Sequence, residues 1–274
     1  MWGLLPVADG ADAGHGMITV QDLHKTYASR TVLSAINLRF PTGQLTSLVG
    51  PNGAGKTTLL MMIARLLKPS QGVIRLDGSP VENIRIGEYA KRVATLRQTP
   101  EFNLRLTVEE LVAFGRFPYT HGTLTQHDHQ VIDDALSFLS LTALRGAYLN
   151  ELSGGQRQMA FLAMTIAQQT DYLLLDEPLN NLDIKHAVQI MQALRRLCDE
   201  YGRTVILVVH DINFAANYSD YIVAMKGGAV HCDGNVTDVI TEQRLSELYG
   251  LNFDVARDER GYLCNYFKPS GNLV

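Results

Sequence analysis

The sequence predicts an α/β fold in which short buried strands alternate with amphipathic helices. An apolar run at residues 45–49 leads into a glycine-rich stretch and then into a second apolar run at 59–67, the pattern of strand, loop and helix. Two further short runs, 172–175 and 204–209, have the continuous hydrophobicity of strands that are buried on both faces. We therefore expect a sheet with parallel strands covered by helices.

Periodicity places further elements around these strands. Alternating apolar and polar residues near the start predict half-buried strands. Their apolar positions are Ile18 and Val20, then Ile36, Leu38 and Phe40. Residues 99–150 are predicted to be mainly helical, with helices at 108–114 and 131–139. A polar loop at 119–128 and its neighbourhood contain His121, His127 and His129, for which we favour a solvated surface over a metal site.

Two later segments repeat apolar residues at helical spacing. The first has Met159, Leu162, Ala163 and Ile166 on one face, and the second has Ala187, Met191, Leu194 and Leu197. Residues 253–267 alternate weakly around a polar turn and indicate a hairpin. The expected organisation is a leader at 1–16, one main domain at 17–250 whose part at about 99–168 is helix-rich, and a tail at 251–274.

The composition narrows the class of protein. Of 274 residues, 46% are hydrophobic, which is enough for a sizeable core. The formal net charge is −4, so we expect no nucleic-acid partner. Three scattered cysteines, Cys198, Cys232 and Cys264, favour a reducing compartment over a disulfide framework.

No stretch has the length of a membrane span. A span needs about 18–20 apolar residues, and the run at 59–67 is interrupted by Arg65. Residues 1–16 contain no Lys or Arg and so lack the positive start of a signal peptide. We expect a flexible leader, with Met17 as an alternative start, on a soluble chain that can dock on a membrane protein.

A glycine-rich loop carries the most specific motif. It matches the pattern GxxxxGK[ST] with the residues Gly50, Pro51, Asn52, Gly53, Ala54, Gly55, Lys56 and Thr57. Glycines let the backbone approach phosphate oxygens, and the N–H groups of the loop and the helix start form an anion cradle. Lys56 adds positive charge at the β- and γ-phosphates, and the Thr57 hydroxyl can bind Mg²⁺. The flanking strand and helix favour this interpretation over an ordinary glycine turn.

A second site is indicated where the strand at 172–175 ends in Asp176 and Glu177. A carboxylate at a strand end can complete the shell of a Mg²⁺ ion, the role expected for Asp176. Glu177 can then accept a proton from an attacking water. Acids after a strand are common on surfaces, and it is their combination with the phosphate loop that favours catalysis.

A third motif opens the helix that follows Leu152. It consists of Ser153, Gly154, Gly155 and Gln156. A serine with two glycines at a helix start can bind a phosphate, although a serine can also simply cap the helix. Two anion sites in one chain are explained by a head-to-tail dimer in which each nucleotide lies between the phosphate loop of one chain and the Ser-Gly-Gly segment of the other.

In this order, the motifs resemble the ATP-binding subunit of an ABC transporter. The resemblance covers about residues 17–250 and implies a P-loop NTPase cassette with two lobes, a mixed-sheet ATP-binding core and a helical lobe. It implies ATP and Mg²⁺ as the ligands. The matching nucleotide-binding positions are residues 50–57, Thr58, Asp176 and residues 153–156.

Other roles come from the resemblance alone. Tyr27 resembles the aromatic residue that stacks on adenine, and Gln98 resembles the glutamine that meets Mg²⁺ and water and reports to the membrane partner. His210 resembles the histidine that contacts the γ-phosphate. Asp183 matches a nucleotide-site aspartate, but Asn180-Asn181 stands before it where most relatives have Ser-Ala.

The particular transporter is indicated by three segments, residues 106–119, 209–213 and 247–250. They resemble the importer branch that handles iron siderophores, haem and cobalamin, in which ferric siderophore uptake is our leading interpretation. The alternative is an importer subunit for another class of substrate. The resemblance implies a homodimer bound to a permease dimer, peripheral on the cytoplasmic face of the inner membrane, and an extracytoplasmic substrate-binding protein. We expect part of the segment 107–119, including Arg116 and Phe117, to form the wall of a groove for a permease helix.

Two other functions share the signature. A DNA-repair ATPase would separate the phosphate loop from Ser153 by a long coiled coil, and here residues 58–151 show no sustained heptads. A ribosome-associated ABC protein usually has two cassettes, and here there is one.

Overall fold

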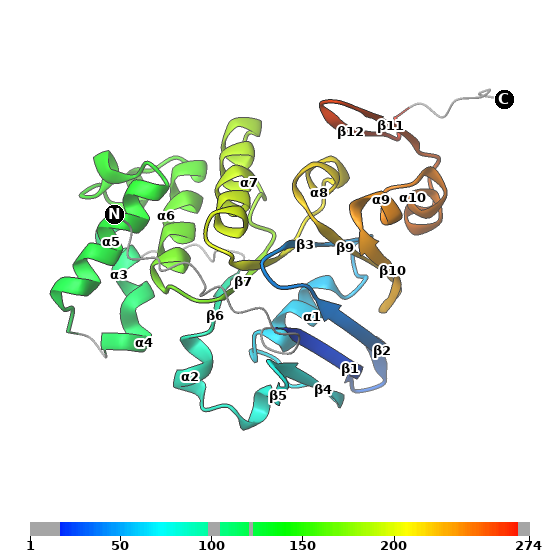
Figure 1. Cartoon of the computed structure of the whole chain (residues 1–274), viewed down its shortest axis with the longest axis horizontal. Coiled ribbons are helices and arrows are strands. Elements are labelled where there is room, and N and C mark those ends of the chain that lie inside the picture. The colour runs from blue at the N-terminus through cyan, green and yellow to red at the C-terminus, as the bar shows by residue number, and fades with distance from the viewer. Residues whose placement is uncertain (1–16, 98–104, 121–122, 268–274) are drawn as a thin grey trace. The chain divides into compact units, whose positions relative to one another are not determined.

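The computed structural model describes residues 17–97, 105–120 and 123–267. The expected leader at 1–16 lies outside these residues. The chain forms two compact units (Figure 1). Of the described residues, 17–83 and 206–267 form the strand-rich unit, and those within Ile84–Val205 form the helix-rich unit.

The strand-rich unit begins with an antiparallel sheet. Its strand order is β2 (Arg30–Phe40), β1 (Ile18–Tyr27), β4 (Gln71–Leu76) and β5 (Ser79–Pro80), followed by the short helix η1 (Val81–Asn83). Ile18 pairs with Phe40 on one side and with Leu76 on the other, and all three are buried. The alternating pattern of the sequence therefore predicted β1 and β2, whereas β4 and β5 were not predicted.

A second group of strands in this unit supports the phosphate loop. β3 (Leu45–Val49) is fully buried and runs parallel to β9 (Tyr221–Lys226), which pairs antiparallel with β10 (Ala229–Asn235). The strand β8 (Thr204–Val208) crosses the boundary between the units. Just after β8, the Val209 N–H donates to the Leu48 carbonyl at 3.2 Å. The segment that leaves β8 therefore lies beside the end of β3.

The helix after the glycine loop is shifted from its expected position. The sequence indicated residues 59–67, whereas α1 spans Lys56–Ile63. It ends in a Schellman turn, because Arg65 has a left-handed φ of 59° and the Leu66 N–H donates to the Met61 carbonyl at 2.9 Å. An apolar run alone does not reveal such a turn, so the predicted end was four residues late.

The remainder of the strand-rich unit is C-terminal. It contains α8 (Ile212–Tyr218), α9 (Val236–Val239), α10 (Glu242–Tyr249), and an antiparallel hairpin of β11 (Asp254–Asp258) and β12 (Gly261–Asn265). The amide side chains of Asn213 and Asn217 pair with the β12 backbone: the Cys264 and Tyr262 N–H groups each donate to one of them at 2.8 Å. α8 thus holds the hairpin (Figure 1).

The helix-rich unit packs its helices around a short parallel pair, β6 (Val93–Leu96) and β7 (Tyr172–Asp176). α3, α5 and α6 lie against one another (Figure 1). The helices are α2 (Ile86–Ala90), α3 (Val108–Ala113), η2 (Phe114–Arg116), α4 (Phe117–Thr120), α5 (Gln126–Phe138), η3 (Thr142–Leu144), η4 (Leu149–Glu151), α6 (Gly154–Ala167) and α7 (Ile184–Asp199). The apolar faces predicted for α6 and α7 are buried.

The polar segment 119–128 is not wholly a loop, as the sequence suggested. Thr125 caps a helix that starts at Gln126, so His127 and His129 lie exposed on α5, while His121 lies outside the described residues. In the part of the chain that the structure describes, no three metal-ligating side chains gather. Within the same residues, no helix combines the length and the apolar character of a bilayer span.

Candidate functional site

The phosphate loop takes a backbone path that demands glycine at its two ends. Gly50 follows β3 with φ +135°, and a Cβ there would lie 2.0 Å from the carbonyl oxygen of Met225 in β9. Gly55 has φ +98°, and a Cβ there would lie 2.4 Å from the Leu33 side chain. Only glycine fits both conformation and space. The loop therefore packs closely against β9 at Gly50 and against β2 at Gly55, and it leads directly into α1.

Lys56 is the first residue of α1 and is only 4% exposed. Its Nζ donates to the carbonyls of Gly50 at 2.7 Å and Pro51 at 3.0 Å, which hold the ammonium inside the loop. Among the described residues, no side chain caps this helix start and its first turn contains no acid. Its N–H groups and the buried cation therefore suit a phosphate.

Two more predicted residues belong to this strand-rich unit. Tyr27 ends β1 with 49% of its surface exposed, and the Lys25 ammonium lies 4.8 Å from the centre of its ring. His210 is exposed and directly follows Val209, whose N–H is bonded to Leu48 of β3. His210 thus lies at the same strand end as the phosphate loop. Thr57 is exposed and Thr58 half-buried at the start of α1.

The acidic pair lies in the helix-rich unit at the end of β7. Asp176 is 4% exposed, and Glu177 is half-buried. Glu177 has a left-handed φ of 52°, a conformation that costs an ordinary side chain on the order of 1–3 kcal/mol and is often retained at functional sites. Its carboxylate accepts a hydrogen bond from the Asn180 side chain. Asn180, which entered the sequence analysis only as a departure from the usual pattern, therefore orients Glu177.

The signature segment, residues 152–156, opens α6 with a capping box. The Ser153 hydroxyl accepts from the Gln156 N–H at 3.2 Å, and the Gln156 side chain accepts from the Ser153 N–H at 3.0 Å. A Cβ on Gly155 would lie 2.3 Å from the His186 ring, so this glycine is required by close packing. Sequence reasoning missed His186, for which the only signal was its position three residues after Asp183.

Asp183 links this segment to α7. Its Oδ1 accepts from both the backbone N–H and the Nδ1 of His186 at 2.8 Å, the ring nitrogen being assigned as a donor. These hydrogen bonds, the backbone one foremost, lower the pKa of Asp183. The aspartate thereby caps α7 and sets the ring of His186 against Gly155. Gln98, the remaining predicted residue, lies outside the described residues.

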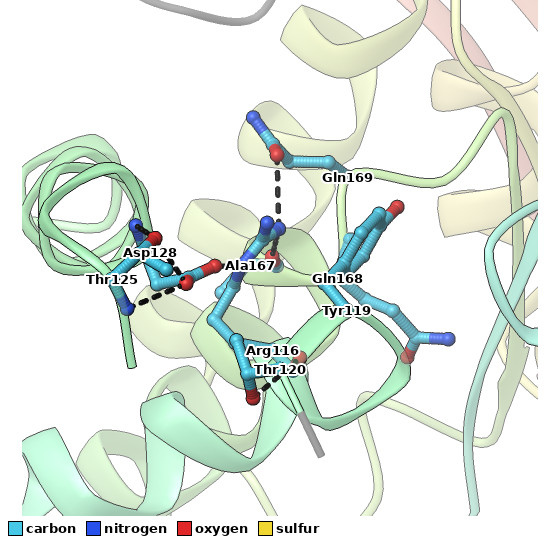
Figure 2. Close-up of polar contacts among 8 residues, drawn as sticks. All are labelled: Arg116, Tyr119, Thr120, Thr125, Asp128, Ala167, Gln168 and Gln169. Atoms are coloured by element: carbon cyan, nitrogen blue, oxygen red, sulfur yellow. Dashed lines mark hydrogen bonds and ion pairs between the residues drawn. The ribbon is translucent and has the colours of Figure 1, made fainter. Parts of the chain in front are cut away.

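The segment 107–119 divides into a buried and an exposed part. Val108 and Leu111 are buried in the helix-rich unit, whereas Phe114 is 54% and Phe117 62% exposed. The expectation that Arg116 lines a groove is wrong, because its side chain is 2% exposed. The reason is Asp128, whose carboxylate accepts from the Arg116 Nε at 2.8 Å in the interior (Figure 2).

Asp128 also closes the capping box of α5. Its Oδ2 accepts from the Thr125 N–H at 2.9 Å and from the Thr125 hydroxyl at 2.6 Å (Figure 2). Burial raises the pKa of Asp128, and the hydrogen bonds from Thr125 and Arg116 outweigh that effect and lower it to about 2. Both members of the pair are therefore charged at neutral pH.

Together, the glycine loop, the buried lysine and the uncapped helix start define a nucleotide-binding protein of the phosphate-loop class. A family model described as ABC transporter matches residues 33–180. The petrobactin import ATP-binding protein YclP of Bacillus subtilis is 45% identical, over 92% of this chain and all of that protein. The chain belongs to the ABC transporter ATP-binding family and is an ATPase.

Two further comparisons agree with this assignment. The iron(3+)-hydroxamate import ATP-binding protein FhuC of Bacillus subtilis is 38% identical, over 89% of this chain and 91% of that protein. The dimeric structure of MJ0796, a bacterial ABC transporter cassette, matches with a TM-score of 0.70 at 31% identity, over 80% of this chain and 98% of that one. The predicted family, fold class and enzyme class are thus confirmed.

The first testable consequence concerns Gly50. Alanine at this position should destabilise the protein more than Gly78→Ala, since Gly78 has φ +79° in open space and its substitution costs about 1–2 kcal/mol from conformation alone. At Gly50 the β9 backbone must also move away from the new methyl group. Urea unfolding of both variants measures the difference, and equal losses would show that the loop is not pressed against β9.

A second consequence concerns pH. Asp128→Asn leaves Arg116 buried without its counter-charge, which should cost about 3–5 kcal/mol at neutral pH. The Asp128 carboxylate has a pKa of about 2 in the folded protein, compared with an ordinary value of 3.8. Its contribution to the free energy of unfolding is therefore complete above the ordinary value of 3.8 and is lost as the pH falls through about 2.

The gap in unfolding free energy between wild type and Asp128→Asn should therefore stay constant from neutral pH to about 5 and narrow below about 4. Asp133→Asn, at a more exposed partner of Arg145, is the control and should cost under about 1 kcal/mol. A gap that widens on acidification contradicts the assignment.

Proposed function

We propose that this chain is the ATP-hydrolysing subunit that powers import of a ferric siderophore through a separate membrane permease. The observation that carries the proposal is the start of α1, which no side chain of the described residues caps and where the Lys56 ammonium is buried. The Ser153 segment at the start of α6 is proposed as a second phosphate contact, which would replace its present cap by Ser153 and Gln156. The iron substrate is supported by the relatives named for petrobactin and iron-hydroxamate import.

In this proposal the strand-rich unit holds the nucleotide. The Tyr27 ring stacks on adenine, and the N–H groups of residues 50–58 surround the phosphates, with the Lys56 ammonium turning from the loop carbonyls toward them. Thr57, Asp176 and Gln98 supply oxygen ligands of the kind Mg²⁺ prefers. When bound, Mg²⁺ neutralises charge on the phosphate oxygens during transfer.

Hydrolysis depends on Glu177 and His210. The Glu177 carboxylate, held by Asn180, accepts the proton of the attacking water, and His210 contacts the γ-phosphate from its strand end. Gln98 completes the catalytic set by orienting the water.

Each nucleotide site is completed by a second copy of the chain. The Ser153–Gln156 segment and Asp183 of one chain face the phosphate loop of the other, so ATP binding closes a homodimer and hydrolysis reopens it. The dimer lies on the cytoplasmic face of the inner membrane, against a permease dimer. A permease helix docks at Phe114 and Phe117, and an extracytoplasmic binding protein delivers the iron complex.

The nucleotide site is tested with Lys56→Ala. Removing the buried ammonium should lower MgATP affinity by more than about tenfold, equivalent to roughly 1.4 kcal/mol. Isothermal titration calorimetry measures the affinity, and Lys68→Ala, at an exposed lysine of the same unit, is the control. Near-normal affinity in Lys56→Ala would mean that the loop is not the phosphate site.

The catalytic base is tested with Glu177→Gln. The amide keeps the size of the side chain but cannot take a proton, so hydrolysis should fall by about 10²–10⁴-fold while ATP still binds. ATP should then trap the closed dimer, which elutes earlier than the monomer in size-exclusion chromatography. Wild-type turnover in this variant removes Glu177 from the role of base.

The docking surface and the substrate are tested with Phe117→Asp. A charge at this exposed ring should weaken co-purification of the permease and lower uptake of radioactive iron as ferric petrobactin. ATPase activity of the isolated subunit should remain near normal. The control is Leu263→Asp, which alters an equally exposed apolar side chain on β12. If deleting the gene leaves all ferric siderophore uptake intact but abolishes haem or cobalamin uptake, the substrate assignment is wrong.

A further inference from the structure

The buried Arg116 has no part in the mechanism above, yet it joins three segments of the helix-rich unit. Its Nε donates to Asp128 at the start of α5, and its Nη1 donates to the Ala167 carbonyl at 2.8 Å and to Gln169 Oε1 at 2.9 Å. Ala167 is the last residue of α6. A single guanidinium therefore ties the segment 114–120 to the start of one helix and the end of another (Figure 2).

The charges at this junction match the polarity of both helices. The last carbonyls of a helix have no partner within it and carry partial negative charge, so the Arg116 cation satisfies the end of α6. Asp128 lies in the first turn of α5, where the helix favours an anion. Each charge is thus stabilised by a helix end as well as by the other charge. The junction consequently resists sliding of one segment past the next.

The segment is fastened at a second point one turn later. The Arg116 guanidinium lies 4.1 Å from the centre of the Tyr119 ring, and the Tyr119 hydroxyl donates to the Gln168 carbonyl at 3.0 Å (Figure 2). Phe117 lies between these two residues in the sequence and is exposed. The exposed ring therefore stands on a single turn whose two ends are both bound to the end of α6.

We propose that Arg116 is a positioning residue that couples movement of the docking surface at Phe117 to the helix carrying the signature segment. This inference rests on the proposed docking of a permease helix. α6 has 14 residues, so a rod of about 21 Å connects Ala167 with Ser153. When α4 is displaced, the hydrogen bond from Arg116 to Ala167 moves α6 with it. The signature segment Ser153–Gln156, at the other end of α6, then moves relative to the nucleotide of the opposite chain.

The chemistry of the junction requires an arginine. Its planar fork reaches Asp128 with one nitrogen and the end of α6 with another, and its face packs on Tyr119. A lysine keeps the charge and can pair with Asp128, but a single ammonium cannot span both helices in that geometry. Arg116→Lys therefore keeps the positive charge beside Asp128 but loses the connection between the start of α5 and the end of α6.

The same unit offers a matched control. Arg145 also bridges two helices, pairing with Glu109 of α3 at 2.5 Å and Asp133 of α5 at 2.6 Å. The hydrogen bonds of its guanidinium hold α3 and α5 and do not involve α6. Arg145→Lys makes the same chemical change at a more exposed bridge between two helices and leaves the connection between Phe117 and Ser153 intact.

The experiment compares both variants in the complete complex with its permease, reconstituted in proteoliposomes and supplied with radioactive ferric petrobactin. Basal ATPase of the isolated subunit, co-purified permease and iron transported per ATP hydrolysed are measured. Arg116→Lys should keep basal ATPase and permease binding but lower the iron-to-ATP ratio by about tenfold, within the usual range of coupling between sites. Arg145→Lys should keep the wild-type ratio even where its melting temperature falls.

A wild-type ratio in folded Arg116→Lys, or an equal loss of ratio in both variants, overturns the proposal. If Arg116→Lys does not fold, Tyr119→Phe decides, since it removes only the hydroxyl bond to Gln168: a lowered ratio supports the coupling and an unchanged ratio overturns it. The docking proposal is tested separately: if Phe117→Asp still co-purifies normally with the permease, docking at Phe117 is wrong, whatever the result for Arg116→Lys.

Discussion

The structure depends first on a backbone constraint at Gly50. β3 is buried along its whole length and parallel to β9, so the chain leaving it must turn within the space above the Met225 carbonyl. A left-handed glycine makes that turn, and a second one at Gly55 starts α1. These two conformations place the Lys56 ammonium among the loop carbonyls and leave a helix start for an anion. The position of His210 follows from the same strands, because the residue before it is bonded to β3.

Polar chemistry at helix ends is the second theme of the molecule. Ser153, Asp183 and Asp128 each cap or close the start of a helix with their own side chains, and Arg116 satisfies the end of α6. At α6 and α7 these caps hold the segments proposed to meet the opposite nucleotide. At Arg116 the same chemistry connects two helices with the exposed turn around Phe117. One kind of interaction thus serves stability in some places and positioning in others.

The sequence was sufficient for the features that leave a local pattern. The fully apolar runs predicted β3 and β7, alternation predicted β2, and the motif residues predicted the loop and the family. Features that depend on a particular side-chain contact, near or far along the chain, were not predictable. The burial of Arg116 depends on Asp128, the orientation of Glu177 on Asn180, and the need for Gly155 on His186. The end of α1 was misplaced because a left-handed Arg65 has no apolar signature.

Mixing two inactive variants shows directly whether each nucleotide site is shared between two chains. Lys56→Ala disables the phosphate loop and Ser153→Arg disables the signature segment, so homodimers of either should not hydrolyse ATP. A mixed dimer contains one site in which both partners are intact. The mixture should therefore recover ATP hydrolysis, and the rate should rise with the fraction of mixed dimers. A mixture as inactive as its two components would contradict a shared site.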